Sequence, residues 1–157
     1  MEKVRSAAAA YFLLQGLAVA GWWVLLITYP ESRVWFALQT DSLATLWAFW
    51  LPDLLFIGPG SFVAALAIQA GLRYAGHLSW VVAGGVAYAT LYTLALVMMT
   101  DRGWLGVALM LPAMLWSGVF ATGLTVGGDM FRRGEAGSEA YAPAKAFGEV
   151  IVVWSVI

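Results

Sequence analysis

The sequence predicts an all-α membrane protein: four membrane-spanning helices, an interfacial helix between the first two, and the start of a fifth span. Of its 157 residues, 62% are hydrophobic and only 11% are charged, whereas a soluble domain carries roughly 25% charged residues. Several apolar runs also reach the roughly 20 residues that a helix needs to cross a bilayer. We therefore expect residues 1–157 to form a single membrane-embedded domain whose main partner is the lipid bilayer.

The composition also excludes several classes of function. Cysteine is absent, which excludes disulfides, thiolate nucleophiles and thiolate metal sites. The net charge is −1 and no basic face with interleaved aromatic residues is visible, so no nucleic-acid partner is expected. His77 is the only histidine, and no ligand-like spacing surrounds it. The sequence therefore predicts no metal or cofactor site in this chain.

The first predicted span covers Ala7–Tyr29. A signal peptide is the alternative interpretation, because residues 18–20 read Ala-Val-Ala, which resembles a cleavage site. However, the apolar run continues to Ile27, and the apolar region of a signal peptide is only about 7–15 residues long. We therefore expect an uncleaved helix that ends at Pro30.

The segment from Glu31 to Leu51 is amphipathic rather than uniformly apolar. Asp41 or Ser42 could cap a short helix there. Five apolar residues then follow with the spacing of one helical face: Leu43, Leu46, Trp47, Trp50 and Leu51. Together with the nearby aromatic residues, this pattern predicts an interfacial helix in the aromatic belt of the membrane.

The second predicted span covers Leu54–Arg73, and Asp53 lies at its start. Pro52 disfavours helix at the preceding residue and predicts a break there. Asp53 would then cap the new helix near the water interface, where the helix dipole stabilises its negative charge. The alternative is that Asp53 is drawn inward, where its charge would be costly and require a partner. Pro59 should kink this span.

Two further spans follow. Gly76-His77 predicts a tight connection to a third span over Leu78–Met99. A short turn over Thr100–Gly103 then precedes a fourth span over Trp104–Val126, in which Pro112 is expected to produce a second kink.

The end of the sequence predicts a polar loop and an incomplete span. Gly127–Ala144 is polar and contains Arg132 and Arg133, whose predicted role is topology and contact with lipid headgroups; an anionic ligand is the alternative. Ala146–Ile157 is apolar but gives only about 18 Å of helix, too short to cross. We therefore expect the chain to be the N-terminal part of a longer protein. Within this last run, Glu149 could pair with Lys145, four residues earlier.

The basic residues favour a cytoplasmic N-terminus in the cell membrane, because basic residues are enriched in cytoplasmic segments. With this orientation the inner segments hold six basic residues: Lys3, Arg5, Arg73, Arg132, Arg133 and Lys145. The outer segments hold only Arg33 and Arg102.

Small and polar residues recur at helical spacing inside the spans. Gly123 and Gly127 form a G-x-x-x-G pattern, which favours close helix packing and permits homo-oligomers. The alternative is a polar lumen with four lining residues: Ser61, Gln69, Tyr88 and Tyr92. Gln15 is the only strongly polar side chain in the first span, and we expect it to bond to a neighbouring helix.

Four stretches carry a resemblance to a known family: residues 49–55 (Phe-Trp-Leu-Pro-Asp-Leu-Leu), Gly60-Ser61, residues 88–92, and the approach from Lys145 to Trp154. They resemble the front half of bacterial proteins of the isoprenylcysteine carboxyl methyltransferase-like family. In that family the C-terminal half binds S-adenosylmethionine and carries an Arg-Asn-Pro-x-Tyr segment. This sequence contains no Arg-Asn-Pro, so no catalytic or cofactor residue is carried over. The resemblance implies a membrane-embedded N-terminal module.

Three functions are therefore compatible with the sequence. The first is a non-catalytic membrane module of a larger enzyme, which the resemblance implies to be a methyltransferase that acts on a lipophilic substrate. The second is a small transporter or channel, which the predicted Pro-kinked helices and the tyrosine face would suit. The third is a structural assembly subunit held by the small-residue faces.

Overall fold

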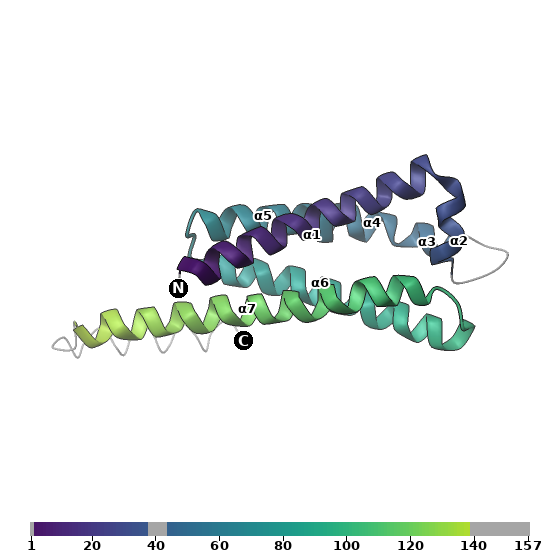
Figure 1. Ribbon diagram of the computed structural model, residues 1–157. Helices are drawn as coiled ribbons and strands as arrows, with labels where there is room; N and C mark the ends of the chain where they lie inside the picture. The colour runs from purple at the N-terminus through teal and green to yellow at the C-terminus, as the bar shows by residue number, and fades with distance from the viewer. Residues whose placement is uncertain (1, 38–43, 139–157) are drawn as a thin grey trace. The chain divides into compact units, whose positions relative to one another are not determined.

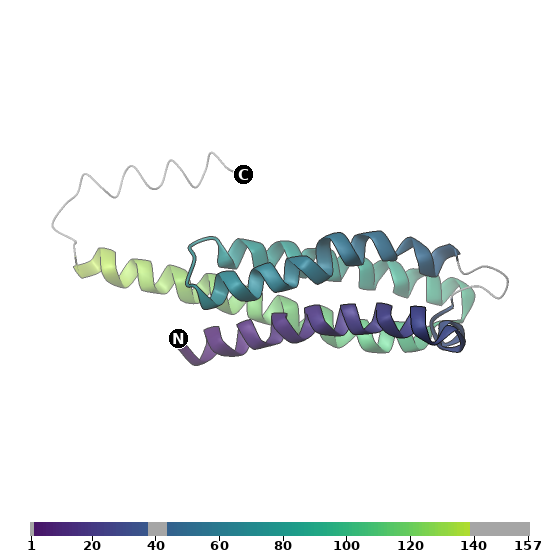
Figure 2. The ribbon, with the colours of Figure 1, turned by 90° about the horizontal axis from the view of Figure 1, so that it is seen from above.

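The computed structural model describes residues 2–37 and 44–138, with the backbone alone at residue 45 and residues 127–138. All regular elements in this part of the chain are helical, which confirms the all-α class. The chain divides into two compact units, Met1–Thr125 and Val126–Ile157. Four helices are long and apolar enough to cross a membrane: Glu2–Thr28, Leu46–Gln69, Ala75–Thr100 and Trp104–Val126. Within the first unit they run lengthwise beside one another (Figures 1 and 2).

The first span is the helix α1, Glu2–Thr28, as predicted. It ends before Pro30, which opens the short 3₁₀ turn η1, Pro30–Ser32, and α2, Arg33–Phe36, follows directly. The Arg33 Nε donates to the carbonyl oxygen of Leu26 at 2.8 Å. A cation at this position satisfies a free carbonyl at the C-terminal end of α1 and interacts favourably with the helix dipole.

The second span differs from the prediction at Pro52. The chain forms α3 (Ala44–Ala48), α4 (Trp50–Pro52), the π-helical turn η2 (Asp53–Ile57) and α5 (Gly58–Gln69). The helix-like run from Leu46 to Gln69 makes one candidate span, so the predicted break at Pro52 is wrong. The predicted capping residues Asp41 and Ser42 lie outside the described residues.

The proline chemistry explains why the helix changes its pitch instead of ending. Pro52 adopts helical angles (φ −58°, ψ −42°), and neither Pro52 nor Pro59 has an N–H to donate. Between them, the Gly58 N–H donates to the carbonyl oxygen of Asp53, five residues back. The wider π turn thus accommodates two missing donors. The Asp53 N–H donates to the carbonyl oxygen of Phe49 at 3.0 Å, so Asp53 lies within the helical run, and its predicted role as a cap is also wrong.

A glycine turn joins α5 to α6, Ala75–Thr100. Gly71 has φ +68°, and its N–H donates to the carbonyl oxygen of Ile68, while Leu72 donates to Ala67; these are the two bonds of a Schellman cap. Arg5 of α1 adds a bond to the same Ile68 oxygen at 3.0 Å. The prediction of the connection at Gly76-His77 is wrong, because Gly71 ends the helix earlier and both residues lie in the first turn of α6.

The turn over Thr100–Gly103 is confirmed, with positive φ at Asp101 and Gly103. It leads into α7, Trp104–Ser138, which contains Pro112. Residues 127–138 were predicted to belong to a polar loop but form the last part of α7, so this prediction is wrong for them. The segment contains no proline to stop the helix that continues from the fourth span, although four of its residues are glycine. Residues 139–157, with the predicted last span and Glu149, lie outside the described residues.

The most extensive helix contact described lies between α1 and α5, and it includes a close approach at Gly16. A Cβ placed on Gly16 would lie 3.1 Å from two ring carbons of Phe62 and 3.2 Å from the carbonyl oxygen of Gly58. Both glycines are buried. Any side chain at Gly16 would therefore require the Phe62 ring and the α5 backbone to shift, whereas glycine allows this close approach.

We predict that Gly16→Val destabilises the bundle by about 1–3 kcal/mol, the usual cost of overpacking. Gly21→Val is the matched control, because a Cβ on Gly21 meets no atom within 4 Å and valine has the same intrinsic helix propensity at both positions. Unfolding of both variants in mixed detergent micelles measures the difference. Equal stability of the two variants would contradict the α1–α5 contact.

Candidate functional site

Three helices share a buried polar network centred on Gln15. On α1, the Tyr11 hydroxyl lies 2.5 Å from Gln15 Oε1. On α7, Ser117 Oγ lies 2.8 Å from the same oxygen. Gln15 Nε2 donates to Ser61 Oγ of α5 at 3.1 Å. The prediction that Gln15 bonds to a neighbouring helix is therefore confirmed, with two helices rather than one.

Every hydroxyl of this network also has a backbone acceptor. Ser61 reaches the carbonyl oxygen of Ile57 at 2.5 Å, and both Tyr11 and Ser117 reach that of Ala113 at 2.7 Å. Each hydroxyl has one proton, so it can donate to only one acceptor at a time. The network can thus redistribute its hydrogen bonds without leaving a hydroxyl unpaired, which suits a structural lock between α1, α5 and α7.

A second polar pair joins α1 to the π-helical turn. The Trp23 indole Nε1–H donates to Asp53 Oδ2 at 3.0 Å. Trp23 is 2% exposed and Asp53 is 5% exposed. The carboxyl group is therefore inside the bundle, as the alternative sequence interpretation required, and its partner is a neutral indole.

An aromatic cluster surrounds Trp23. Its ring centroid lies 4.9 Å from that of Trp22 and 5.9 Å from that of Trp47, and the guanidinium carbon of Arg33 lies 5.3 Å from the Trp47 ring centroid. The buried Trp22 Nε1 has no hydrogen-bond partner among the described residues. The cluster fixes the Trp23 ring, and thereby the direction from which the indole approaches Asp53.

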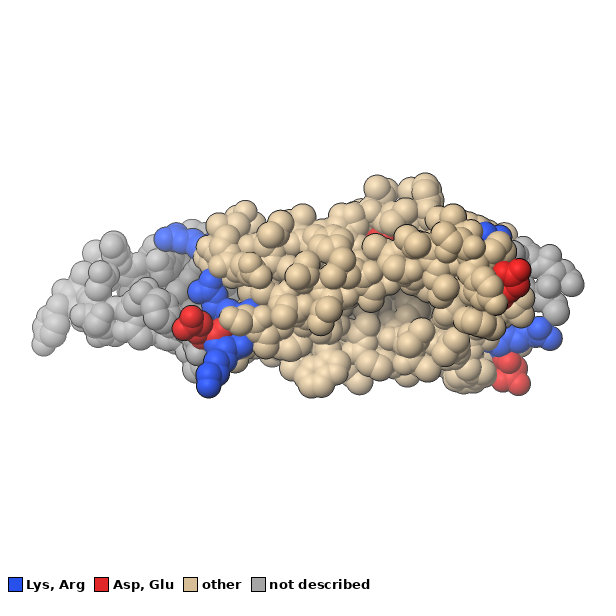
Figure 3. Space-filling model, turned by 45° about the horizontal axis from the view of Figure 1, so that its top comes forward, with Lys and Arg blue, Asp and Glu red and all other residues tan. Residues whose placement is uncertain are grey.

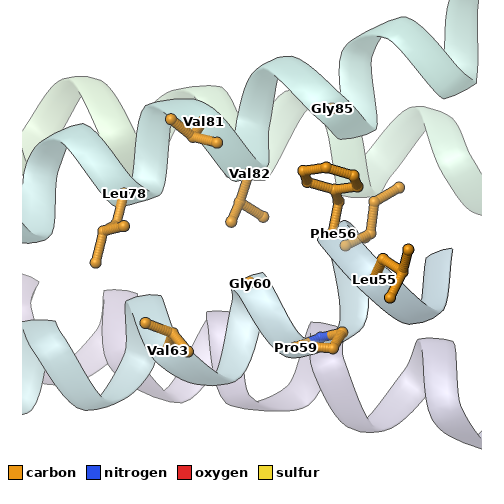
Figure 4. Close-up of a pocket in the computed structure, with 10 residues that line it drawn as sticks. Leu55, Phe56, Pro59, Gly60, Val63, Leu78, Val81, Val82 and Gly85 are labelled. Atoms are coloured by element: carbon orange, nitrogen blue, oxygen red, sulfur yellow. The ribbon is translucent and has the colours of Figure 1, made fainter. Parts of the chain in front are cut away.

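An apolar groove lies between η2, α5 and α6. Its volume is about 310 Å³, and ten residues line it: Leu55, Phe56, Ile57, Pro59, Gly60, Val63, Leu78, Val81, Val82 and Gly85. Figure 4 shows Leu78 and Val82 pointing from α6 toward α5. Phe56 is 66% exposed and Val81 is also 66% exposed. The groove therefore opens sideways, on a face that a membrane would cover with hydrocarbon.

The four residues of the predicted lumen do not line one common space. Ser61 is buried against Gln15, whereas Gln69 is exposed. Tyr88 and Tyr92 stack on each other with ring centroids 6.2 Å apart, and they are 73% and 46% exposed. The tyrosine face thus points outward from α6.

The structure gives few or no side-chain contacts for the remaining predicted positions. Arg132 and Arg133 lie in α7, but their side chains are among those not described. His77 is exposed at the start of α6, and no group of three His, Cys, Asp or Glu residues that could hold a metal occurs in the described part of the chain. Gly123 of the G-x-x-x-G pattern is exposed, and a Cβ on it would lie 3.7 Å from Val4 of α1, an ordinary van der Waals contact.

Tyr11 and Trp23 were not predicted as site residues, and the apolar groove was not predicted at all. Tyr11 is four residues from Gln15 on the same helical face, and this spacing could have identified it. Trp23 is 30 residues from Asp53, and no local pattern connects them.

Comparisons of the chain with protein-family models, with curated proteins and with solved structures find no match.

We predict that Gln15→Leu destabilises the bundle by roughly 2 kcal/mol, because three side-chain hydrogen bonds are lost at about 0.6 kcal/mol each. The loss stays moderate because every hydroxyl keeps its backbone acceptor. Gln69→Leu is the control, since Gln69 is exposed and should change stability by less than about 0.5 kcal/mol. Chemical unfolding of the reconstituted protein compares them, and a neutral Gln15→Leu would show that the network does not lock the helices.

Proposed function

We propose that this chain is an integral membrane module that holds the hydrocarbon part of a lipophilic substrate for a membrane enzyme. The groove between α5 and α6 carries the proposal. Its volume of about 310 Å³ is at the lower end of the range for ligand pockets, roughly 300–1,000 Å³. All its lining residues are apolar or glycine, so a hydrocarbon chain could enter from the bilayer without passing through water.

The enzyme type rests on the sequence resemblance. A methyltransferase of the isoprenylcysteine carboxyl methyltransferase-like kind must hold a lipophilic substrate in the membrane, and this module would be its non-catalytic N-terminal part. S-adenosylmethionine would then bind to a part of the enzyme other than this chain.

The proposed location is the cell membrane, with a cytoplasmic N-terminus. The charged residues with described side chains, other than Asp53, lie at the two ends of the helices (Figure 3). One end holds Glu2, Lys3, Arg5 and Arg73, and the other holds Glu31, Arg33, Asp101 and Arg102. The excess of basic residues at the first end favours the cytoplasm there.

A small transporter is the second candidate, favoured by the buried carboxyl group of Asp53 in a candidate span. Ionisable residues inside membrane helices frequently mark transport pathways. Solute flux into liposomes that is lost on Asp53→Asn would support it, and equal flux of the two proteins would reject it. Homo-oligomerisation through the small-residue faces stays a prediction.

We predict that a long-chain fatty acid with a mid-chain diazirine, photoactivated in nanodiscs, labels the groove residues of α5 and α6. Gly85→Phe should fill the groove and exclude about two methylenes, at about 0.8 kcal/mol each. That loss corresponds to roughly tenfold lower labelling. Mass spectrometry of the adducts measures the yield at each residue.

Gly84→Phe is the matched control. Gly84 is the neighbouring residue on α6 and does not line the groove, and a Cβ on it meets no atom within 4 Å. Its labelling should equal that of the original protein. If both variants are labelled equally, the fatty acid only coats the lipid-facing surface, and the groove does not select it.

A further inference from the structure

Asp53 is unusual, because of its depth, among the charged residues whose side chains are described. It lies seven residues from Leu46 in the candidate span Leu46–Gln69, which is about 10 Å along the helix. It is 5% exposed, whereas the other acidic residues with described side chains, Glu2, Glu31 and Asp101, are exposed at helix ends.

The described surroundings of Asp53 contain no compensating charge. The Trp23 indole N–H is the one described side-chain group that bonds to the carboxyl, through Oδ2 at 3.0 Å. The elements packed against η2 are α1, α4, α5 and α6. Of these, α4 and α5 carry no titratable side chain. The titratable side chains of α1 and α6 are Glu2, Lys3, Arg5, Tyr11, His77, Tyr88 and Tyr92, and no bond from any of them to Asp53 is described.

The charge state follows from this environment. A carboxylate removed from water is costly unless it is paired with a cation or has several donors, and one neutral indole supplies a single donor. A metal ion would instead require several oxygen ligands, and the described part of the chain has no cluster of acidic or histidine ligands. A proton needs no further ligand.

The backbone geometry at Asp53 also supports a functional role for this residue. The residue opens the π-helical turn η2, and π turns inside helices occur frequently at functional sites. The turn lies between Pro52 and Pro59 and next to the close contact of Gly16 with Gly58. The helix therefore departs from regular geometry at the residue that carries the buried carboxyl.

We propose that Asp53 is a proton-binding site within the membrane bundle, in which Trp23 holds Oδ2 and the proton resides on Oδ1. The indole fixes the orientation of the carboxyl, and the proton neutralises it. This inference rests on neither the lipid groove nor the transporter candidate, so its failure and theirs are distinguishable.

Infrared spectroscopy of the full chain in lipid tests the proposal. At about pH 7, where exposed carboxyl groups are ionised, a protonated carboxyl gives a C=O stretching band that a carboxylate lacks. We expect this band in the original protein and its complete loss in Asp53→Asn. The asparagine keeps an oxygen acceptor for Trp23, so the variant should fold.

Asp101→Asn is the matched control. Asp101 also accepts an indole N–H, from Trp104 at 3.0 Å, but this pair is exposed. Its replacement should leave the protonated-carboxyl band unchanged. Absence of the band in the original protein, or its persistence in Asp53→Asn, would overturn the proposal.

The hydrophobic reagent dicyclohexylcarbodiimide gives a second, covalent readout. The reagent takes up the carboxyl proton while the carboxyl oxygen bonds to its central carbon, and the adduct rearranges to a stable N-acylurea. We expect the adduct on Asp53 alone among Glu2, Glu31, Asp53 and Asp101, with a yield that falls as the pH is raised. Labelling of the exposed acids in place of Asp53 would contradict a protonated Asp53.

Discussion

The close approach of α1 to α5 at Gly16 and Gly58 is the constraint on which the other contacts depend. A Cβ on Gly16 would lie 3.2 Å from the Gly58 carbonyl oxygen, so the backbones meet with no side chain between them. At this separation the short Ser61 side chain reaches Gln15, and the Asp53 carboxyl reaches the Trp23 indole. Because lipid gives helices no hydrophobic reason to associate, these packing and hydrogen-bonding contacts must hold the bundle together.

Polar groups and apolar surface are separated along and across the bundle. At the ends, Arg5 and Arg33 satisfy carbonyl oxygens in the last turns of α5 and α1, where cations are favoured by the helix dipole. In the interior, Gln15 joins three helices. On the outside, the groove exposes only hydrocarbon and glycine. The apolar groove thus lies against α6, whereas the buried carboxyl lies on the side of α1.

The sequence was sufficient to predict the four spans because helix length and apolar composition decide them, and Asp101 and Gly103 mark the third interhelical turn. It was insufficient at Pro52, where the local preference against helix is outweighed by a π turn and by contacts with α1. The partner of Gln15 could be predicted only as a neighbouring helix. The pairing of Trp23 with Asp53 depends on which faces of the two helices meet. The two residues are far apart in the sequence, so a single sequence does not determine which faces these are.

A double-mutant cycle on Trp23→Phe and Asp53→Leu tests the α1–η2 contact most directly. The stabilities of both single variants and of the double variant are measured by unfolding in lipid–detergent mixtures. We expect a coupling energy between about 0.6 and 1.7 kcal/mol, which are the average and the largest value for hydrogen bonds between membrane helices. Strictly additive effects would contradict the contact, since residues that do not interact add within about 0.5 kcal/mol.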